Sequence, residues 1–241
     1  MKREYEYLML IMKNASVGYE NQWLFQPIDL SVNKGQIRLI DAPSGAGKSS
    51  FLRWIAGLTT KNMISKGQIW LNDKRLDHLP AEHRHIGFLF QSALLFPHLT
   101  VAENLGFGIP QNYNKTERSD RISDALSRAG MTGMEKRDPN TLSGGQQARI
   151  ALLRTLLAEP EALLMDEPFS SLDHDMRDQI IDLVKREVER LHLPVLMVSH
   201  DPRDHSLTTD PIATLKNGLD KPIYSGNFHI DQPHINHTDE F

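Results

Sequence analysis

The sequence predicts an α/β fold built around a parallel sheet. A glycine-rich loop at residues 41–50 joins an apolar run at 36–40 to a helical pattern at 51–56, in the order strand, loop, helix. The short runs 162–165 and 194–199 are mostly apolar, as in parallel strands that are buried on both faces. An amphipathic stripe with helical spacing lies between them at 173–191. Strands that alternate with helices in this way favour the α/β class.

The composition is that of a soluble globular protein. The chain has 241 residues, 39% hydrophobic and 24% charged, which suits one sizeable domain. A net charge of −4 gives no general basic surface, so we expect no nucleic-acid partner. The absence of cysteine excludes disulfides, thiolate metal sites and cysteine nucleophiles. No apolar run approaches the ~20 residues that span a bilayer, and residues 1–7 do not resemble a secretory signal, so we expect a cytoplasmic protein.

Several elements are predicted around the loop. Short apolar stretches alternate with turn residues over 8–40, which predicts strands and hairpin turns, and further strands are predicted at 67–73 and 85–90. The stretch 92–110 has many apolar side chains for a loop, which indicates a surface that packs against something. Apolar positions with helical spacing over 115–129 predict a surface helix.

The loop at 41–50 has the pattern of a phosphate-binding loop (P-loop). Glycines between a strand and a helix aim backbone N–H groups, and the positive end of the helix dipole, at one point. The Lys48 ammonium adds charge for the outer phosphates, and the Ser49 hydroxyl is placed to hold a magnesium ion. The flanking strand and helix disfavour the alternative, a Gly/Ser loop with an incidental lysine. The residues expected around the phosphates are Ala42, Pro43, Ser44, Gly45, Ala46, Gly47, Lys48, Ser49 and Ser50.

A second anion-binding helix start is predicted in the segment Leu-Ser-Gly-Gly-Gln at 142–146. It leads into a helix that continues to residue 157, with Ser143 as its N-cap. Two glycines there leave backbone N–H groups bare at the positive end of the helix dipole, which favours an anion as it does at the first loop. The residues expected to contact an anion are Ser143, Gly144, Gly145 and Gln146.

Asp166 and Glu167 end the apolar run at 162–165. Paired acids at the carboxyl end of a buried strand are costly unless a cation meets them, and ligands of α/β sheets bind at that end. With a phosphate loop present, this favours Asp166 near a magnesium ion and Glu167 near an attacking water; the alternative is two solvated acids before a turn. His200 follows the run 194–199 at the same kind of strand end.

The remaining patterns have plainer interpretations. By themselves, Tyr19 and Gln91 are ordinary strand residues. We interpret the charge run Lys185, Arg186, Glu187 and Arg190 as the solvated face of the helix at 173–191. One more strand at 212–215 and a turn at 217–218 are expected. The polar tail contains His229, His234 and His237, for which a loosely ordered tail is favoured over a metal site.

Taken in order, these segments resemble the motif series of the ATP-binding subunits of ABC transporters, over residues 8–205. A phosphate loop is shared by many NTPases, whereas Leu-Ser-Gly-Gly-Gln ahead of an acidic strand is highly specific. The run 86–105 resembles the importer branch that takes up polyamines, thiamine, sulfate, iron or sugars with a periplasmic binding protein. The matching segments are 42–50, Gln91, 142–146, Met165-Asp166-Glu167-Pro168, Ser170-Ser171-Leu172-Asp173 and His200.

The resemblance implies a P-loop NTPase fold, with a RecA-like core, an antiparallel β subdomain and an inserted α-helical subdomain. It implies one ABC domain over 1–241, with the core and β subdomain at 8–91 and 158–220, the helical subdomain at 92–157 and a tail at 221–241. Three departures stand out: Ala42 replaces a glycine, Ser50 stands where threonine is common, and the region after His200 lacks the family's usual continuation. Few residues follow His200, so we expect no C-terminal regulatory barrel, as in importers of the short type.

The resemblance also implies roles that the residues alone leave open. Tyr19 would stack on the adenine of ATP, and Gln91 would sense the γ-phosphate and magnesium. Glu167 would be the general base, and His200 would hold the γ-phosphate. The implied catalytic set is Lys48, Gln91, Glu167 and His200, and the implied Mg²⁺ ligands are Ser49, Gln91 and Asp166.

The implied partners begin with a second copy of the chain. Ser143 and Gly145 would contact the γ-phosphate of ATP held by that copy, and Asp173 would cross the same interface. This would explain the second anion site. Integral-membrane permease subunits and, indirectly, a periplasmic or surface solute-binding protein are also implied, with the chain peripheral on the inner face of the cell membrane.

Other functions stay open at this point. A soluble ABC-type ATPase in DNA repair or translation usually has coiled-coil insertions or tandem domains. A non-enzymatic scaffold would not need Lys48, Asp166, Glu167 and His200 together. An ABC exporter or a lipid-handling ATPase is a further alternative, and this chain does not specify the transported solute.

Overall fold

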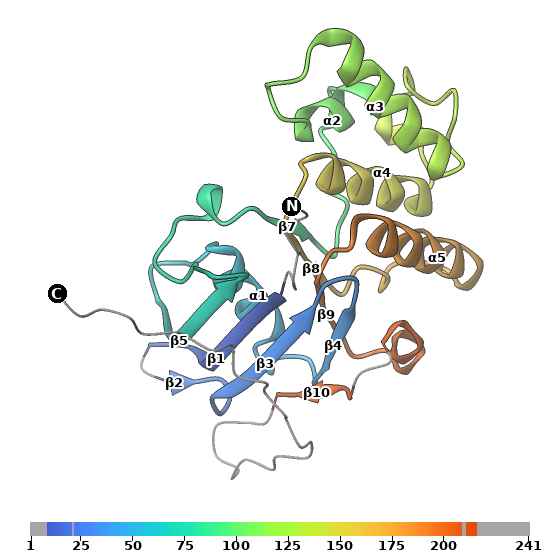
Figure 1. The fold of residues 1–241 in the computed structure, drawn as a ribbon. Helices are drawn as coiled ribbons and strands as arrows, with labels where there is room; N and C mark the ends of the chain where they lie inside the picture. Colours follow the sequence, from blue (N-terminus) through green and yellow to red (C-terminus); the bar gives the residue numbers. More distant parts are fainter. Residues whose placement is uncertain (1–8, 21, 209–210, 216–241) are drawn as a thin grey trace, which may run out of the picture.

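The computed structural model describes residues 9–20, 22–208 and 211–215 (Figure 1). These residues form two five-stranded sheets with helices around them, which confirms the predicted α/β class. The predicted turn at 217–218 and the tail histidines His229, His234 and His237 lie outside the described residues. No helix in the described part is both long and apolar enough to cross a membrane.

One sheet is wholly parallel and brings the ends of its strands to one edge. Its order is β10-β4-β9-β8-β7, with β4 at Ile37–Asp41, β7 at Ile86–Leu89, β8 at Ala162–Asp166, β9 at Val195–Ser199 and β10 at Ala213–Thr214. Asp41 pairs with Ser199, and Asp166 pairs with Val198. The segments that follow β4, β8 and β9 therefore start side by side.

The second sheet is antiparallel. Its strands are β1 at Met9–Tyr19, β2 at Gln22–Trp23, β3 at Ile28–Asn33, β5 at Met63–Leu71 and β6 at Lys74–Arg75. β5 pairs with one edge of β1 along most of its length, while β2 and β3 pair with β1 at different registers.

The strand predicted at 67–73 begins earlier than expected, at Met63. Gly67 is therefore inside the strand. It adopts a φ of 107°, and a Cβ there would lie 2.6 Å from the Lys13 carbonyl oxygen. The register of β1 shifts between Lys13 and Ser16 at this point, so the glycine accommodates a bulge rather than starting the strand.

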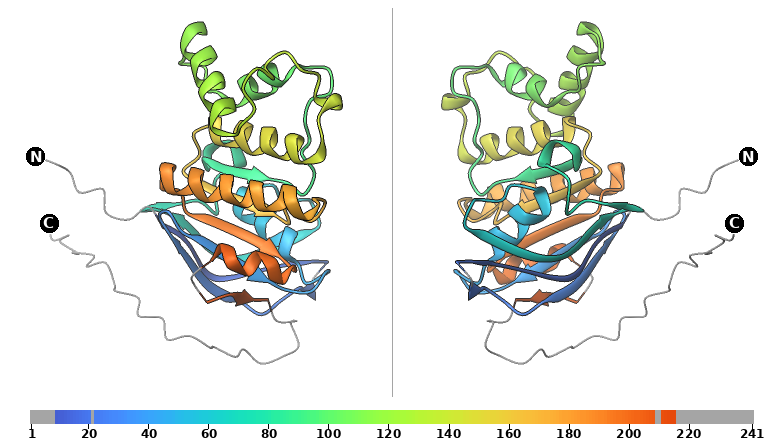
Figure 2. Two further views of the ribbon diagram at one scale, coloured as in Figure 1. Left: turned by 90° about the vertical axis from the view of Figure 1, so that its right-hand side faces the viewer. Right: turned by 90° about the vertical axis from the view of Figure 1, so that its left-hand side faces the viewer.

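Helices cover both faces of the parallel sheet. Alternate residues of β8 face opposite ways: Leu163 and Met165 join the core shared with the helices α4 and α5, whereas Ala162 and Leu164 join the core shared with α1 and the antiparallel sheet. These helices are α1 at Lys48–Ala56, α4 at Gly144–Leu157 and α5 at His174–Leu191. Figure 2 shows the antiparallel strands at one end of the molecule and the helices α2 (Val101–Gly108) and α3 (Lys115–Arg128) at the other.

The apolar stretch at 92–110 contains a helix that the sequence did not predict. This helix, α2 at Val101–Gly108, starts with a capping box formed by Thr100 and Glu103. Val101 and Leu105 are fully buried in the core that α4 shares. The stretch therefore packs mainly within the chain, although the Phe107 side chain is 70% exposed. The predicted surface helix is α3 at Lys115–Arg128, and short 3-10 helices lie at Ala81–His83, Pro139–Thr141 and Pro202–Leu207.

The interpretation of the charge run on α5 as a solvated face is wrong for one residue. Lys185, Arg186 and Arg190 are exposed as expected, but the Glu187 side chain is only 3% exposed. Its carboxylate pairs with Arg128 of α3 at 2.9 Å and with Arg190 at 2.6 Å. Ion pairing explains how a glutamate can occupy a buried position.

Candidate functional site

The loop between β4 and α1 leaves backbone N–H groups open to a ligand. Gly45 and Gly47 have φ values of 82° and 92°, which favour glycine. Gly47 is the N-cap of α1, and no side chain caps the first turn of the helix. A Cβ on Gly45 would meet nothing within 4 Å, so the loop is open at this point, whereas one on Gly47 would lie 2.8 Å from the Leu24 side chain. The arrangement is that of an anion cradle.

Lys48 brings the loop together with two strand ends. Its side chain is 5% exposed, and its Nζ donates to the carbonyl oxygen of Ala42 at 2.5 Å. The same Nζ lies 3.2 Å from Oε1 of Glu167, and Nδ1 of His200 lies 3.1 Å from that oxygen. Residues from α1 and from the ends of β8 and β9 thus meet at one carboxylate. The buried Ala42 contributes the backbone carbonyl oxygen that accepts this hydrogen bond from Lys48, and a glycine would present the same oxygen.

Ser49 and Asp166 form a second contact between the loop and β8. The Ser49 hydroxyl donates to Oδ1 of Asp166 at 2.8 Å, and Asp166 is buried at the end of β8. Hydroxyl and carboxylate oxygens are ligands that Mg²⁺ prefers. The pair is therefore of the chemistry that fits a magnesium ion beside the phosphate cradle.

Asp166 and Glu167 have pKa values that shift in opposite directions. Burial raises the pKa of Asp166, and the hydrogen bond from Ser49 offsets only part of that effect. Burial also acts to raise the pKa of Glu167, but the hydrogen bonds from His200 and Lys48 outweigh it and lower this pKa overall. Glu167 is therefore ionised at neutral pH, in the form that can accept a proton.

Glu167 also has an unusual backbone conformation. Its φ of 46° lies in the left-handed region, which is uncommon for a residue other than glycine. Its N–H donates to the carbonyl oxygen of Val198 at 3.0 Å, and its own carbonyl oxygen accepts from the Ser170 hydroxyl at 2.9 Å. Backbone strain of this kind is often found at functional sites. The turn directs the side chain away from the strand, toward Lys48 and His200.

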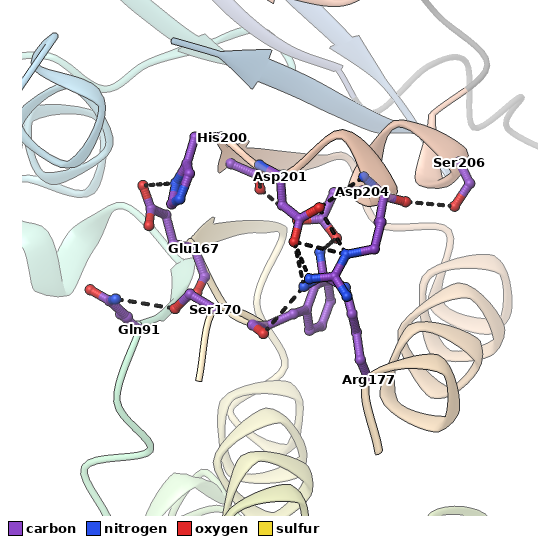
Figure 3. Close-up of polar contacts among 11 residues, drawn as sticks. Gln91, Glu167, Ser170, Arg177, His200, Asp201, Asp204 and Ser206 are labelled. Atoms are coloured by element: carbon purple, nitrogen blue, oxygen red, sulfur yellow. Dashed lines mark hydrogen bonds and ion pairs between the residues drawn. The ribbon is translucent and has the colours of Figure 1, made fainter. Parts of the chain in front are cut away.

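Gln91 and Tyr19 each contact a serine next to the site. Figure 3 shows the exposed Gln91 with its Nε2 donating to the Ser170 hydroxyl at 3.1 Å, so that Ser170 links Gln91 to the backbone of Glu167. The Tyr19 hydroxyl lies 3.0 Å from Oγ of Ser50, which places the end of β1 against the first turn of α1. Pro43 and Ser44 are exposed on the loop, and Ala46 is buried beneath it.

The segment 143–146 lies on a different part of the chain. Ser143 is the N-cap of α4 as predicted: its hydroxyl accepts from the N–H of Gln146, and the Gln146 side chain completes a capping box. A Cβ on Gly145 would lie 2.4 Å from the sulfur of Met176, while Gly144 is open. Among the described residues, the contacts of this segment are with α4 and α5 rather than with the phosphate loop. Asp173 is the N-cap of α5 nearby.

Sequence reasoning gave no individual role to four polar residues close to the site, one of which lies in the matching segment 170–173. They are Ser170, Arg177, Asp201 and Asp204. For Arg177 a signal existed: it follows the helical spacing of the buried Ile180 and Val184, so it occupies the apolar stripe of α5. The segment after residue 201 has no periodic pattern that could have identified Asp204.

The fold and the site together define a P-loop nucleotide hydrolase. A parallel sheet presents, at its carboxyl edge, an open glycine loop with its lysine, a serine hydroxyl beside an aspartate, and a second acid. A family model described as ABC transporter matches residues 25–170. The chain belongs to the ABC transporter family and is an ATP-binding, ATP-hydrolysing domain of that family.

Several curated proteins are similar to the chain. The uncharacterized ABC transporter ATP-binding protein YnjD of Escherichia coli (strain K12) is 44% identical over 196 residues, which is 81% of this chain and 90% of YnjD. The spermidine/putrescine import ATP-binding protein PotA of Salmonella typhimurium is 35% identical over 212 residues, which is 88% of this chain and 55% of PotA. The chain therefore spans about half the length of the PotA proteins it matches.

A solved structure has the same fold. It is described as a dimeric, post-hydrolysis state of the ATP-binding cassette MJ0796 bound to ADP and Pi. It matches with a TM-score of 0.73 and 28% identity, covering 87% of this chain and 95% of that one. The P-loop NTPase fold and the ABC family that the sequence motifs predicted are thus confirmed.

Proposed function

We propose that this chain is the ATP-hydrolysing subunit of an ABC transporter that powers solute import through membrane permease subunits. The observation that supports it most directly is the meeting of Lys48, Glu167 and His200 at one carboxylate oxygen beside the phosphate loop. The import function is favoured by the similarity to PotA, which is described as a spermidine/putrescine import protein.

The proposed chemistry depends mainly on positioning and electrostatics. Residues 42–50 bind the phosphates through backbone N–H groups, and Lys48 stabilises negative charge that develops on the γ-phosphoryl group. Ser49, Asp166 and Gln91 would hold a magnesium ion, which supplies further charge neutralisation. Glu167 orients a water molecule and accepts its proton, in agreement with its lowered pKa.

Two further residues complete the half-site on this chain. His200 holds the Glu167 side chain through its Nδ1 and presents the rest of its exposed imidazole to the γ-phosphate. The Tyr19 ring stacks on the adenine, at the end of β1 where its hydroxyl meets the first turn of α1.

A second copy of the chain would complete the site. Since Ser143, Gly144, Gly145 and Gln146 contact α4 and α5 rather than the phosphate loop of their own chain, they are available to an ATP bound by the other copy. Asp173 would cross the same interface. The dimeric state of the MJ0796 structure supports this arrangement. The helical part at 92–157 would meet the permease, with the core at 8–91 and 158–220 on the cytoplasmic side of the membrane.

The experiment that tests the catalytic assignment is Glu167→Gln. We expect the variant to bind ATP with wild-type affinity and to hydrolyse it at least ~100-fold more slowly, because the proton acceptor is lost while the phosphate cradle stays intact. Phosphate release and ATP binding are measured separately. The matched control, Glu189→Gln on the exposed face of α5, should hydrolyse ATP normally. Robust hydrolysis by Glu167→Gln would refute the assignment of the base.

Import is tested with the membrane partner. The chain is co-purified with its permease, both are reconstituted in vesicles, and ATP-dependent uptake is measured with polyamines as the first solutes, given the similarity to PotA. Uptake that requires ATP and an intact Glu167 supports import. ATP-dependent movement in the opposite direction would identify an exporter.

A further inference from the structure

We propose that Arg177, through a buried ion pair with Asp204, is a positioning residue for ATP hydrolysis that fixes His200 against Glu167. The proposal deepens the proposed function, because it rests on the roles of His200 and Glu167 given above. Neither Arg177 nor Asp204 contacts the phosphate loop in the structure, so their effect acts through the two segments that they join.

The first observation is the burial of opposite charges beside the site. The side chains of Arg177 and Asp204 are each 3% exposed. The Arg177 guanidinium pairs with Asp204 through Nη2 and with Asp201 through Nη1 at 2.9 Å (Figure 3). Buried ion pairs are weak evidence for stability, because apolar residues of similar volume often stabilise as well. What the pair provides here is a defined geometry between α5 and the segment after β9.

The cluster fixes the chain on both sides of His200. Ser199 precedes His200 at the end of β9, and its hydroxyl donates to Oδ2 of Asp204 at 2.5 Å. Asp201 follows His200, and its N–H donates to the Ser199 hydroxyl at 3.0 Å. The imidazole between them is largely exposed and contacts Glu167 through Nδ1. An exposed side chain keeps such a contact only if its backbone is held in place.

The same guanidinium also reaches the segment that follows Glu167. Nη1 of Arg177 lies 3.5 Å from the carbonyl oxygen of Phe169, a long hydrogen bond, and the guanidinium lies 5.8 Å from the Phe169 ring. Phe169 is buried and comes two residues after Glu167. Arg177 therefore contacts both segments whose relative position sets the distance between His200 and Glu167. Asp201 has a second partner, the exposed Arg203, whereas Asp204 has no other cationic partner among the described ion pairs.

The test compares variants of this cluster with a matched pair elsewhere on α5. Arg177→Met removes the guanidinium, and Ser199→Ala removes only the hydroxyl that links β9 to Asp204. The control is Glu187→Gln, which breaks a similarly buried ion pair on the same helix, away from the site. We expect kcat to fall about tenfold to a hundredfold in Arg177→Met, since small misplacements of reacting groups have effects of this size. Ser199→Ala should show a smaller loss, and KM for ATP should stay within about twofold in both.

Glu187→Gln should lower the melting temperature as Arg177→Met does, with kcat unchanged. The proposal would be overturned if Ser199→Ala and a folded Arg177→Met both kept wild-type kcat. Equal losses of kcat in Arg177→Met and Glu187→Gln would also overturn it. If Arg177→Met does not fold, Ser199→Ala decides alone.

A second measurement separates this inference from the proposed function. The histidine imidazole NMR resonances of the nucleotide-free protein are recorded, and that of His200 is identified by its loss in His200→Asn. The His200 signal should shift or broaden in Arg177→Met and Ser199→Ala but not in Glu187→Gln. Lack of hydrolysis by the wild type would refute the proposed function and leave this readout valid. An unchanged His200 signal in both cluster variants would refute the positioning role.

Discussion

Asp166 and Glu167 are adjacent in the chain, and their environments fit them for different tasks. Asp166 is the buried last residue of β8, and its carboxylate accepts a hydrogen bond from the Ser49 hydroxyl. Glu167 turns out of the strand in a left-handed conformation and meets Lys48 and His200. Asp166 therefore lies beside the phosphate loop, where we propose that it is a magnesium ligand, while Glu167 is ionised, as its proposed role of proton acceptor requires. The left-handed turn of the backbone at Glu167 is what gives the two adjacent carboxylates different partners.

Asp201 gives a prediction about pH at the scale of a single residue. Hydrogen bonds from Arg203, joined by the nearby charge of Arg177, hold the pKa of Asp201 well below its usual range despite some burial. Because folding lowers this pKa, the ionised carboxylate stabilises the folded state above the unfolded-state pKa of about 3.9, and this contribution is lost as the pH falls below it. Asp201→Asn should therefore be less stable than wild type at pH 6, with a difference that narrows below about pH 4.

Urea unfolding between pH 6 and pH 3 measures this difference. Asp182→Asn, an exposed position on α5, serves as the control and should change stability little at any pH. A difference between wild type and Asp201→Asn that stays constant down to pH 3 would contradict the prediction.

At the scale of elements, α4 and α5 form a unit that joins the helical part to the site. Ser143 and Asp173 cap the two helices, and Met176 of α5 fills the space above Gly145 of α4. The second glycine of the Leu-Ser-Gly-Gly-Gln segment thus has a packing role in addition to its proposed contact with ATP. Glu187 at the other end of α5 ties the same helix to α3 through Arg128.

The two glycines of α4 give a matched stability prediction. A Cβ on Gly145 would overlap the Met176 sulfur, so Gly145→Ala should destabilise the protein by about 1–3 kcal/mol, toward the lower end because methionine is flexible. Gly144→Ala has open space and should change stability by about 0.5 kcal/mol or less. Chemical unfolding measures both, and adding Met176→Ala to Gly145→Ala should reduce the loss. Equal effects at the two positions would show that helix propensity, not packing, controls this turn.

At the scale of the whole molecule, the parallel sheet brings the residues of the phosphate site together. The Leu-Ser-Gly-Gly-Gln segment at 142–146 lies apart from them, at the start of α4. The strand order places the segments after β4, β8 and β9 together, although β4 ends more than 100 residues before β8 and β9 end in the sequence. Figures 1 and 2 show α2 and α3 projecting from the body of the molecule, with α4 packed between them and α5. This separation is what the proposed composite site between two copies requires.

Mixing two inactive variants tests the composite site. Lys48→Ala should inactivate the phosphate loop, and Ser143→Arg should block the segment offered to the partner. In a mixed dimer one of the two composite sites is intact, so an equimolar mixture should recover up to about a quarter of wild-type ATPase activity if the copies pair at random. Mixing Lys48→Ala with the Lys48→Ala/Ser143→Arg double variant is the control and should recover nothing. A first mixture no more active than its separate components would argue against a shared site.

The sequence alone determined the features that follow from local chemistry. The glycine loop before a helix, the apolar runs of β8 and β9, the cap at Ser143 and the start of α5 depend on neighbouring residues, so their patterns were sufficient. Fold class and family followed from them. The roles assigned to the site residues remain predictions that the variants above test.

Only the tertiary structure decided the features that depend on partners distant in the chain. Glu187 was expected on the solvated face of α5, yet it is buried because Arg128 lies against it. The buried pairing of Arg177 with Asp204 was not predicted at all. The bulge at Gly67 was not expected either, because it depends on the strand that pairs with it. The contact of Lys48 and His200 at Glu167 requires three segments to meet at one sheet edge. A local pattern predicts a helix or a strand, but the burial of a charge and the register of a strand are set by what packs against them.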